Sequence, residues 1–219
     1  GGTVDLFYYP AEEEKYQAHK EYKSDLTSAE KTGVLVDIGG NRFGGAHPTY
    51  RLQAAIDDLE FDLTFESQTK SIRLGQDFIR FGDNQERYWN LTVLGPRAIC
   101  SGAITVAGEK IAYSGLAYFD HGWSTYRIYE FSQRWHVIRI LEKDLSINAI
   151  ELNFRNGFSP TKTQALFITL GDKVIANSGA VTLTPQGGMQ SVSPLLPPVS
   201  RPVQILTVTG KTGGRKLSA

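Results

Sequence analysis

The sequence predicts an all-β protein whose strands close, or nearly close, into an antiparallel barrel. Its 219 residues include 22 Gly and 9 Pro, 11% are aromatic, and short β-branched and aromatic runs recur between turn-forming residues. In the clearest run, residues 59–66, apolar and polar side chains alternate without error, as in a strand with one buried face. A sandwich fits this pattern too, but a barrel leaves no long edge strand exposed.

Further strands follow from the same alternation. Turn-forming residues separate them, for example Gly39-Gly40-Asn41, Ala107-Gly108 and Asn156-Gly157. With residues 59–66 they make eight predicted strands, the others being 34–38, 89–93, 111–123, 135–141, 147–154, 165–170 and 203–208.

Two segments differ from this pattern. Residues 10–31 begin with Pro10, continue with three Glu and become richer in Lys, which predicts one short surface helix oriented as the helix dipole prefers. Residues 186–202 contain Gly-Gly, Pro-Pro and isolated prolines, which is typical of a linker or an extended strap. We therefore expect a barrel over residues 1–185, and a strap, a last strand and a basic tail over residues 186–219.

Composition excludes several classes of function. The 23 basic and 23 acidic residues and the pI near 7.1 argue against a nucleic-acid surface. Cys100 is the single cysteine, so it cannot form an internal disulfide or a zinc cluster. No apolar run reaches the roughly 18 residues of a membrane span, and the start lacks the features of a signal peptide. We expect a cytoplasmic protein without stable membrane insertion.

The densest group of reactive side chains is the segment from Tyr113 to Ser124. In an extended segment, Tyr118 and Asp120 share one face, while Phe119, His121 and Trp123 share the other. A carboxylic acid desolvated among aromatics could keep its proton and donate it. The alternative is that Asp120 and His121 end a strand and hold the turn at Gly122. A register shift of one residue would exchange the two faces.

The same segment carries a family resemblance. Gly115-Leu116-Ala117-Tyr118-Phe119-Asp120-His121-Gly122-Trp123 resembles the Gly-x-x-Tyr-x-Asp-His-x-Trp signature of the carotenoid 1,2-hydratase (hydroxyneurosporene synthase) family and its AttH relatives, which look related to the lipocalin-like fungal Diels-Alderases. Residues 36–43 (VDIGGNRF) and 101–106 (SGAITV) support it.

This resemblance implies a lipocalin-like β-barrel with a pocket for a long apolar substrate. It also implies that Asp120 is the proton donor and that Tyr118, His121 and Trp123 surround it. Ser124 departs from the family, where Gly commonly follows the Trp. The chain is short for two full barrels, so we expect a second barrel domain or a homodimer partner outside this sequence.

Aromatic residues on other predicted strands are candidates for the pocket wall. Any single one is more often part of a core, but together Tyr and Trp can line a ligand cavity and offer polar tips. We predict substrate contacts from six aromatics: Trp123, Phe119, Tyr113, Trp89, Trp135 and Tyr50.

Other signals point to no further site. His19, His47 and His136 do not stand with His121 at metal-ligand spacing, so we predict no metal. The glycines of residues 39–45 precede no helix, so they indicate a tight turn and a mobile loop at the barrel mouth instead of a phosphate cradle. We expect His136 to lie on a strand surface.

Three functions fit these residues. The first is a cofactor-independent cyclase of natural-product biosynthesis, which folds an elongated unsaturated polyketide or isoprenoid for a pericyclic or acid-catalysed cyclisation. The second is a hydratase that adds water to a double bond. The third is a carrier that shields a lipid or pigment without converting it.

Overall fold

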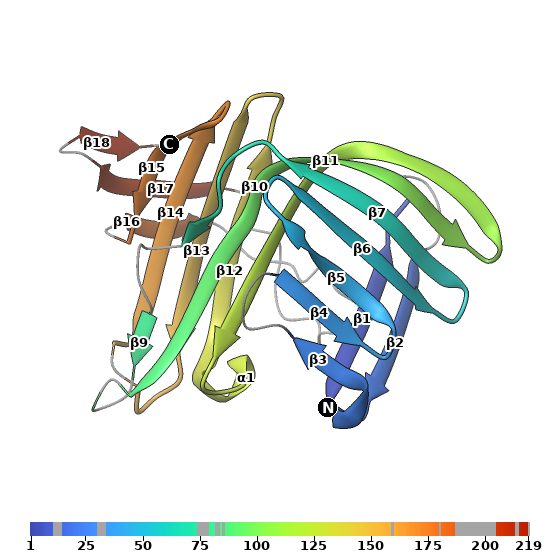
Figure 1. Cartoon of the computed structure of the whole chain (residues 1–219). Helices are drawn as coiled ribbons and strands as arrows, with labels where there is room; N and C mark the ends of the chain where they lie inside the picture. The colour runs from blue at the N-terminus through green and yellow to red at the C-terminus, as the bar shows by residue number, and fades with distance from the viewer. Residues whose placement is uncertain are drawn as a thin grey trace. The chain divides into compact units, whose positions relative to one another are not determined.

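The computed structural model describes residues 1–10, 15–29, 34–73, 79–81, 84, 86–158, 160–179, 181–186, 205–212 and 215–218. These residues form strands almost throughout, with one 3-10 turn and one short α-helix (Figure 1). The all-β prediction is therefore confirmed. No helix in this part of the chain is long and apolar enough to cross a membrane.

The described elements are almost all strands. In order they are β1 Gly2–Tyr8, β2 Tyr16–Tyr22, η1 Ser24–Leu26, β3 Thr27–Ala29, β4 Val34–Ile38, β5 Asn41–Ala46, β6 Thr49–Ile56, β7 Leu59–Ser67, β8 Ile72–Arg73, β9 Ile79–Phe81, β10 Arg87–Val106, β11 Glu109–Ser124, α1 Ile128–Phe131, β12 Ser132–Leu141, β13 Leu145–Phe154, β14 Lys162–Leu170, β15 Lys173–Ser178, β16 Val181–Gln186, β17 Ile205–Thr212 and β18 Arg215–Ser218.

These strands form four antiparallel sheets. The largest follows the order β11-β10-β7-β6-β5-β4-β3, and β8 and β9 also pair with β10. The others are β1-β2, β12-β13-β14-β15 and β16-β17-β18. Tight turns set the register of two hairpins in the largest sheet. Gly39 and Gly40 (φ 61° and 88°), like Ala107 and Gly108 (φ 49° and 83°), have the two positive φ angles of a type I′ turn.

The turn after β4 is held by side chains of the predicted Asn-Arg-Phe stretch. The buried Asn41 amide donates to the Tyr22 hydroxyl and the Ile38 carbonyl, each at 2.9 Å, and accepts from the Ala55 backbone N–H. Because residues 41–46 pair with β4 and β6 as strand β5, the predicted mobile loop after this turn was wrong. The turn itself is confirmed.

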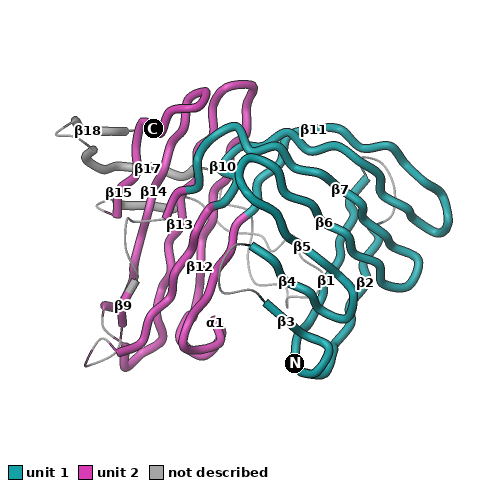
Figure 2. Tube along the Cα trace, viewed as in Figure 1, with its two compact units in different colours: residues 1–71, 94–119 teal, residues 72–93, 120–219 magenta. Residues whose placement is uncertain are grey.

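The chain divides into two compact units (Figure 2). Unit 1 comprises Gly1–Ser71 and Leu94–Phe119. In it, β3 to β7 and parts of β10 and β11 form a curled antiparallel sheet, consistent with a lipocalin-like barrel. The hairpin β1-β2 contributes Leu6 and Ala18 to the same core as Tyr50, Leu63 and Phe119. The interior of unit 1 is thus packed with side chains.

Unit 2 comprises Ile72–Val93 and Asp120–Ala219. It contains the four-stranded sheet β12 to β15, helix α1 and the ends of β10 and β11. Phe81, Phe131 and Phe154 form an aromatic cluster there, with ring centroids 4.6 to 6.0 Å apart. This cluster anchors α1, because Phe131 is the last residue of the helix and is fully buried.

The predicted helix over residues 10–31 was wrong for the part that the structure describes. Residues 16–22 pair with β1 as β2, and residues 24–29 form η1 and β3. Ala18 is the buried residue of β2, and His19 pairs with Asp5 across the hairpin at 2.6 Å. A strand that buries so little apolar surface carries no clear period-2 pattern. Residues 11–14 and 30–31 lie outside the described residues.

The division between a barrel and a C-terminal segment stays a prediction. Most of the predicted linker, residues 187–202, lies outside the described residues. The predicted last strand corresponds to β17, which pairs with β16 and β18.

Candidate functional site

The signature segment lies on β11 at the point where the two units divide. Phe119 is the last residue of unit 1 and Asp120 resumes unit 2. The Phe119 ring packs against Tyr50, Phe65 and Phe43, with centroids at 4.9, 5.3 and 5.6 Å. Phe119 and Tyr50, which the sequence assigned to the substrate, therefore lie in the hydrophobic core of unit 1.

Asp120 lines a pocket of unit 2 with a volume of about 560 Å³. Four strands and α1 build its wall, and the end of β11 contributes the alternate positions Asp120, Gly122 and Ser124 together with Trp123. The lining residues are Trp89 and Leu91 of β10, Asp120, Gly122, Trp123 and Ser124 of β11, Ile128 of α1, Trp135, Val137 and Arg139 of β12, and Ile150 of β13.

Tryptophan dominates this wall. The chain has 3 Trp, and Trp89, Trp123 and Trp135 all line the pocket. Trp89 is buried, whereas Trp123 and Trp135 are 48% and 52% exposed. Large aromatics half-exposed around a hollow are typical of ligand sites, because a bound apolar molecule would cover them. Three of the six predicted substrate contacts are thus brought together with Asp120.

Asp120 is paired with an arginine. Nη2 of Arg139 lies 3.4 Å from Oδ2 of Asp120, and both side chains are partly exposed. Asp120 thus accepts a contact from Arg139 in the pocket wall, and its predicted role as a proton donor stays a prediction. Arg139 was not among the residues predicted for the site. Its signal was the alternation of Trp135, Val137 and Arg139 along β12, which places them on one face.

The other predicted residues have surroundings of their own. The His121 ring contacts Trp123 edge to face, with centroids 5.6 Å apart. Tyr118 belongs to unit 1 and is half-buried, and Tyr113 is an exposed residue of the same part of β11. The roles that the sequence gave to Tyr118, His121 and Tyr113 stay predictions.

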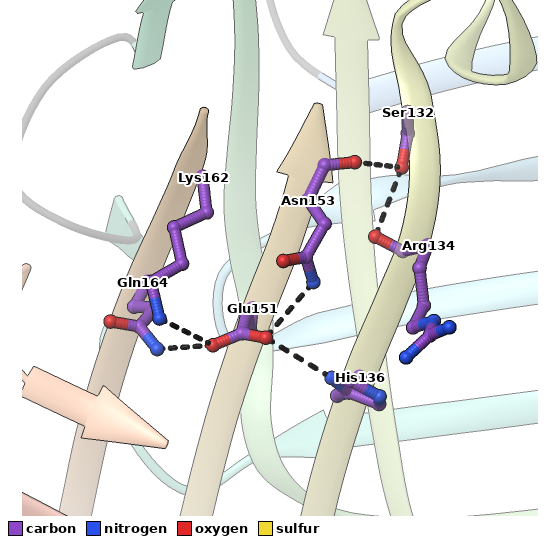
Figure 3. Close-up of polar contacts among 7 residues, drawn as sticks. All are labelled: Ser132, Arg134, His136, Glu151, Asn153, Lys162 and Gln164. Atoms are coloured by element: carbon purple, nitrogen blue, oxygen red, sulfur yellow. Dashed lines mark hydrogen bonds and ion pairs between the residues drawn. The ribbon is translucent and has the colours of Figure 1, made fainter. Parts of the chain in front are cut away.

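The opposite face of the β12-β13-β14 sheet carries a buried polar network centred on Glu151 (Figure 3). Its carboxylate accepts hydrogen bonds from Asn153 at 2.9 Å and from Gln164, and lies 3.6 Å from Nζ of Lys162. His136, which was expected on a surface, is half-buried with Nδ1 3.3 Å from Glu151. Because these partners of the carboxylate come from β12, β13 and β14, the network links three strands.

Burial and hydrogen bonding shift the pKa of Glu151 in opposite directions. Burial alone would raise its pKa, but the hydrogen bonds from Asn153 and Gln164, the charge of Lys162 and the contact with His136 outweigh burial and hold the pKa below its ordinary value. Glu151 is therefore ionised in the folded protein at neutral pH.

A protein-family model identifies the chain. The model of the Svf1 family matches residues 6–189. The chain belongs to the Svf1 family. No curated protein matches the sequence of this Svf1-family chain.

Two solved structures resemble the Svf1-family chain in fold. One is an AttH-type protein from Nitrosomonas europaea, with a TM-score of 0.58 and 18% identity. The other is kievitone hydratase from Nectria haematococca, with a TM-score of 0.58 and 20% identity. Each comparison covers 94% of this chain and 63% of the other, so the chain spans less than two thirds of the length of these proteins. The predicted likeness to AttH proteins is confirmed at the level of the fold.

Proposed function

We propose that this Svf1-family protein binds an elongated unsaturated small molecule in the tryptophan-lined pocket and acts on it as a hydratase. The observation that carries the proposal is the Asp120–Arg139 ion pair, which lies in the wall of a pocket that also contains all three tryptophans. An apolar hollow with a few convergent polar groups is the usual form of a small-molecule site.

Two kinds of side chain in the pocket wall would bind different parts of the ligand. Indole faces of Trp89, Trp123 and Trp135 suit the flat, polarisable surface of a conjugated chain. Arg139 supplies a fixed positive charge, which attracts an electron-rich oxygen such as a carbonyl. A ligand with a conjugated carbonyl at one end and an apolar chain at the other would contact both Arg139 and the tryptophans.

The ion pair suits addition of water to a double bond conjugated with that carbonyl. The Asp120 carboxylate accepts a proton from water as the water oxygen bonds to the β-carbon. The π electrons of the double bond shift to give an enolate, whose oxygen Arg139 stabilises. The proton on Asp120 then passes to the α-carbon, which regenerates the carboxylate and the carbonyl. The sum is one water added and no oxidant or metal consumed, and the reverse sequence removes water.

The fold likeness to a protein named as a hydratase supports this choice, although at 20% identity it concerns the fold only. Cyclisation is the second candidate, because three indole faces around one hollow can hold a polyene in a folded conformer without any base. An acid-catalysed cyclase would need Asp120 to donate a proton, whereas the contact of Asp120 in this wall is the ion pair with Arg139.

Isotope labelling separates these candidates. The protein is incubated in H₂¹⁸O with the small molecules extracted from it after purification from its own producer, and with a panel of long-chain α,β-unsaturated ketones. A hydratase gives a product heavier by one labelled water, and Asp120→Asn should lower its rate by about 10²-fold or more. The matched control is Asp62→Asn, which breaks the exposed Arg51–Asp62 ion pair of unit 1 and should leave turnover unchanged.

The other outcomes are equally specific. A product of unchanged mass that survives Asp120→Asn would indicate cyclisation by conformational selection. Tight binding with no product in either variant would reject the hydratase and indicate a carrier.

A further inference from the structure

Unit 2 contains a buried polar cluster that the proposed reaction does not use. Its members are Ser146 and Asn148 of β13 and Thr169 of β14, which are 0%, 4% and 0% exposed. The strand register places Ser146 directly opposite Thr169, and Asn148 is the diagonal neighbour of Thr169. Directly opposite and diagonal pairs on one face of a sheet lie within side-chain reach. The three side chains therefore share one small region of the sheet face.

Two polar atoms of this cluster, on Asn148 and Thr169, have no hydrogen-bond partner within the described part of the chain. The Asn148 amide donates to the Ser146 hydroxyl at 2.8 Å. Among the described residues, neither Oδ1 of Asn148 nor Oγ1 of Thr169 has a hydrogen-bond partner. A buried polar atom without a partner typically costs about 1–3 kcal/mol, so two such atoms in one cluster indicate that something else binds there.

The cluster lies beside the pocket. Asn148 is directly opposite Arg139, which lines the pocket and pairs with Asp120. Asn148 is also two residues before Ile150 on β13, so it faces the same side of the sheet as this pocket residue. Glu151 is three residues after Asn148 on β13, so its network lies on the other face of the sheet and cannot satisfy these atoms.

We propose that Asn148 and Thr169 form a binding site for an O–H group at the Arg139 side of the pocket. Oδ1 of Asn148 accepts only, so its partner must donate, which a carbonyl or carboxylate oxygen cannot do. The Thr169 hydroxyl both donates and accepts. If the Asn148 amide is rotated by half a turn, its nitrogen takes the place of Oδ1 and needs a hydrogen-bond acceptor. The oxygen of a hydroxyl group can accept this hydrogen bond, so the same ligand group fits both orientations. A buried ammonium would carry a charge with no carboxylate among the three cluster residues.

Two sources provide this chemistry: a resident water molecule and a hydroxyl group of the pocket ligand. Buried waters commonly satisfy such polar atoms with two to four hydrogen bonds. The site does not depend on the proposed hydratase activity, because the two polar atoms need a partner whether or not the pocket catalyses a reaction.

The test compares two probes that differ only in the O–H donor, 1-decanol and decyl methyl ether. Their binding to the full chain is measured by the fluorescence of the tryptophans, all of which line the pocket. If a ligand hydroxyl occupies the site, decanol binds about ten-fold more tightly than the ether. Thr169→Val and Asn148→Leu then abolish this preference. Thr163→Val, a half-buried position of the same strand, is the matched control and keeps it.

A crystal structure of the unliganded protein and thermal unfolding of the variants decide the remaining cases. Equal binding of both probes, an ordered water on Asn148 and Thr169, and a lower melting temperature for Thr169→Val than for Thr163→Val would identify water as the occupant. An empty site, equal binding of both probes and a Thr169→Val variant as stable as the wild type or more so would overturn the proposal. If turnover fails while the decanol preference persists, the hydratase alone is rejected.

Discussion

Arg139 contacts Asp120 from a different sheet: Asp120 lies on β11 of the nine-stranded sheet, four residues before the end of that strand, and Arg139 lies on β12 of the four-stranded sheet. The intervening chain turns through α1, whose Phe131 is fixed in the aromatic cluster of unit 2. The ion pair is therefore a tertiary contact, and its 3.4 Å distance depends on the position of that short helix.

Breaking this ion pair should affect function far more than stability. Both side chains are partly exposed, and exposed ion pairs contribute about 0–1 kcal/mol. We expect Asp120→Asn and Arg139→Gln each to change the free energy of unfolding by less than about 1 kcal/mol, measured by urea denaturation. Each should nevertheless weaken turnover or ligand binding strongly. A loss of several kcal/mol in stability would show instead that the pair serves the fold.

Ligand binding should change the tryptophan fluorescence of the protein. Trp123 and Trp135 are about half exposed and line the pocket with Trp89, so an apolar ligand removes water from them. We expect a shift of the emission maximum to shorter wavelength on binding. Trp135→Phe should reduce this shift and retain part of the affinity, because Phe preserves an aromatic face. An unchanged spectrum under saturating ligand would place the ligand outside this pocket.

The strands that alternate cleanly could be predicted from the sequence, and so could the aromatic and acidic residues on them. Residues 59–66 are an example, because their alternation is a local property that β7 preserves. Arg139 and β2 could not be predicted in the same way. Arg139 gains its role from a partner 19 positions earlier, and β2 is a strand because it pairs with β1, although its Glu and Lys pattern suits a helix.

The buried cluster on β13 and β14 illustrates the same limit. Ser146, Asn148 and Thr169 are ordinary strand-surface residues by composition, and nothing local distinguishes them. They form a cluster only because the strand register places Ser146 opposite Thr169 and Asn148 diagonal to Thr169, and because the fold buries all three.

Glu151→Gln should destabilise the protein in a pH-dependent way. Since the folded-state pKa of Glu151 lies below its ordinary value of 4.5, its ionised form stabilises the fold above that value, and this contribution is lost as the pH falls through the folded-state pKa. We expect the variant to be less stable than the wild type at pH 7 by about 1–3 kcal/mol. The difference should shrink as the pH is lowered below 4.5.

Chemical denaturation at a series of pH values measures this difference. The exposed Glu60→Gln is the control, and its effect should be small at every pH. A Glu151→Gln penalty that is the same at pH 3 and pH 7 would contradict the assignment of an ionised, hydrogen-bonded carboxylate.

Cys100 should react with thiol reagents only after unfolding. It is buried in the core of unit 1, and burial raises the pKa of its thiol to about 11. The reactive thiolate is therefore scarce at neutral pH, and reagents cannot reach it. We expect negligible modification by iodoacetamide in the native protein and complete modification in denaturant, followed by mass spectrometry. Rapid labelling of the native protein would mean that unit 1 opens locally around β10.

The packing of the Phe119 ring in the core of unit 1 should require a glycine at position 95. A Cβ atom at Gly95 would lie well inside van der Waals contact of the Phe119 ring, which cannot move freely because Tyr50, Phe65 and Phe43 surround it. We expect Gly95→Ala to destabilise the protein by about 1–3 kcal/mol in denaturation experiments. Gly179→Ala is the matched control, since its nearest contact, at 3.7 Å, is ordinary.

Gly95→Ala should also affect Asp120, which follows Phe119 on β11. Phe119 fixes which side of the strand faces the core of unit 1, and Asp120 follows it directly, so its side chain points to the other side. If a displaced Phe119 shifts the strand, binding of the pocket ligand should weaken along with stability, whereas Gly179→Ala should leave both unchanged. Full ligand affinity in a clearly destabilised Gly95→Ala variant would show that the position of Asp120 is set within unit 2 alone, by Arg139 and the pocket wall.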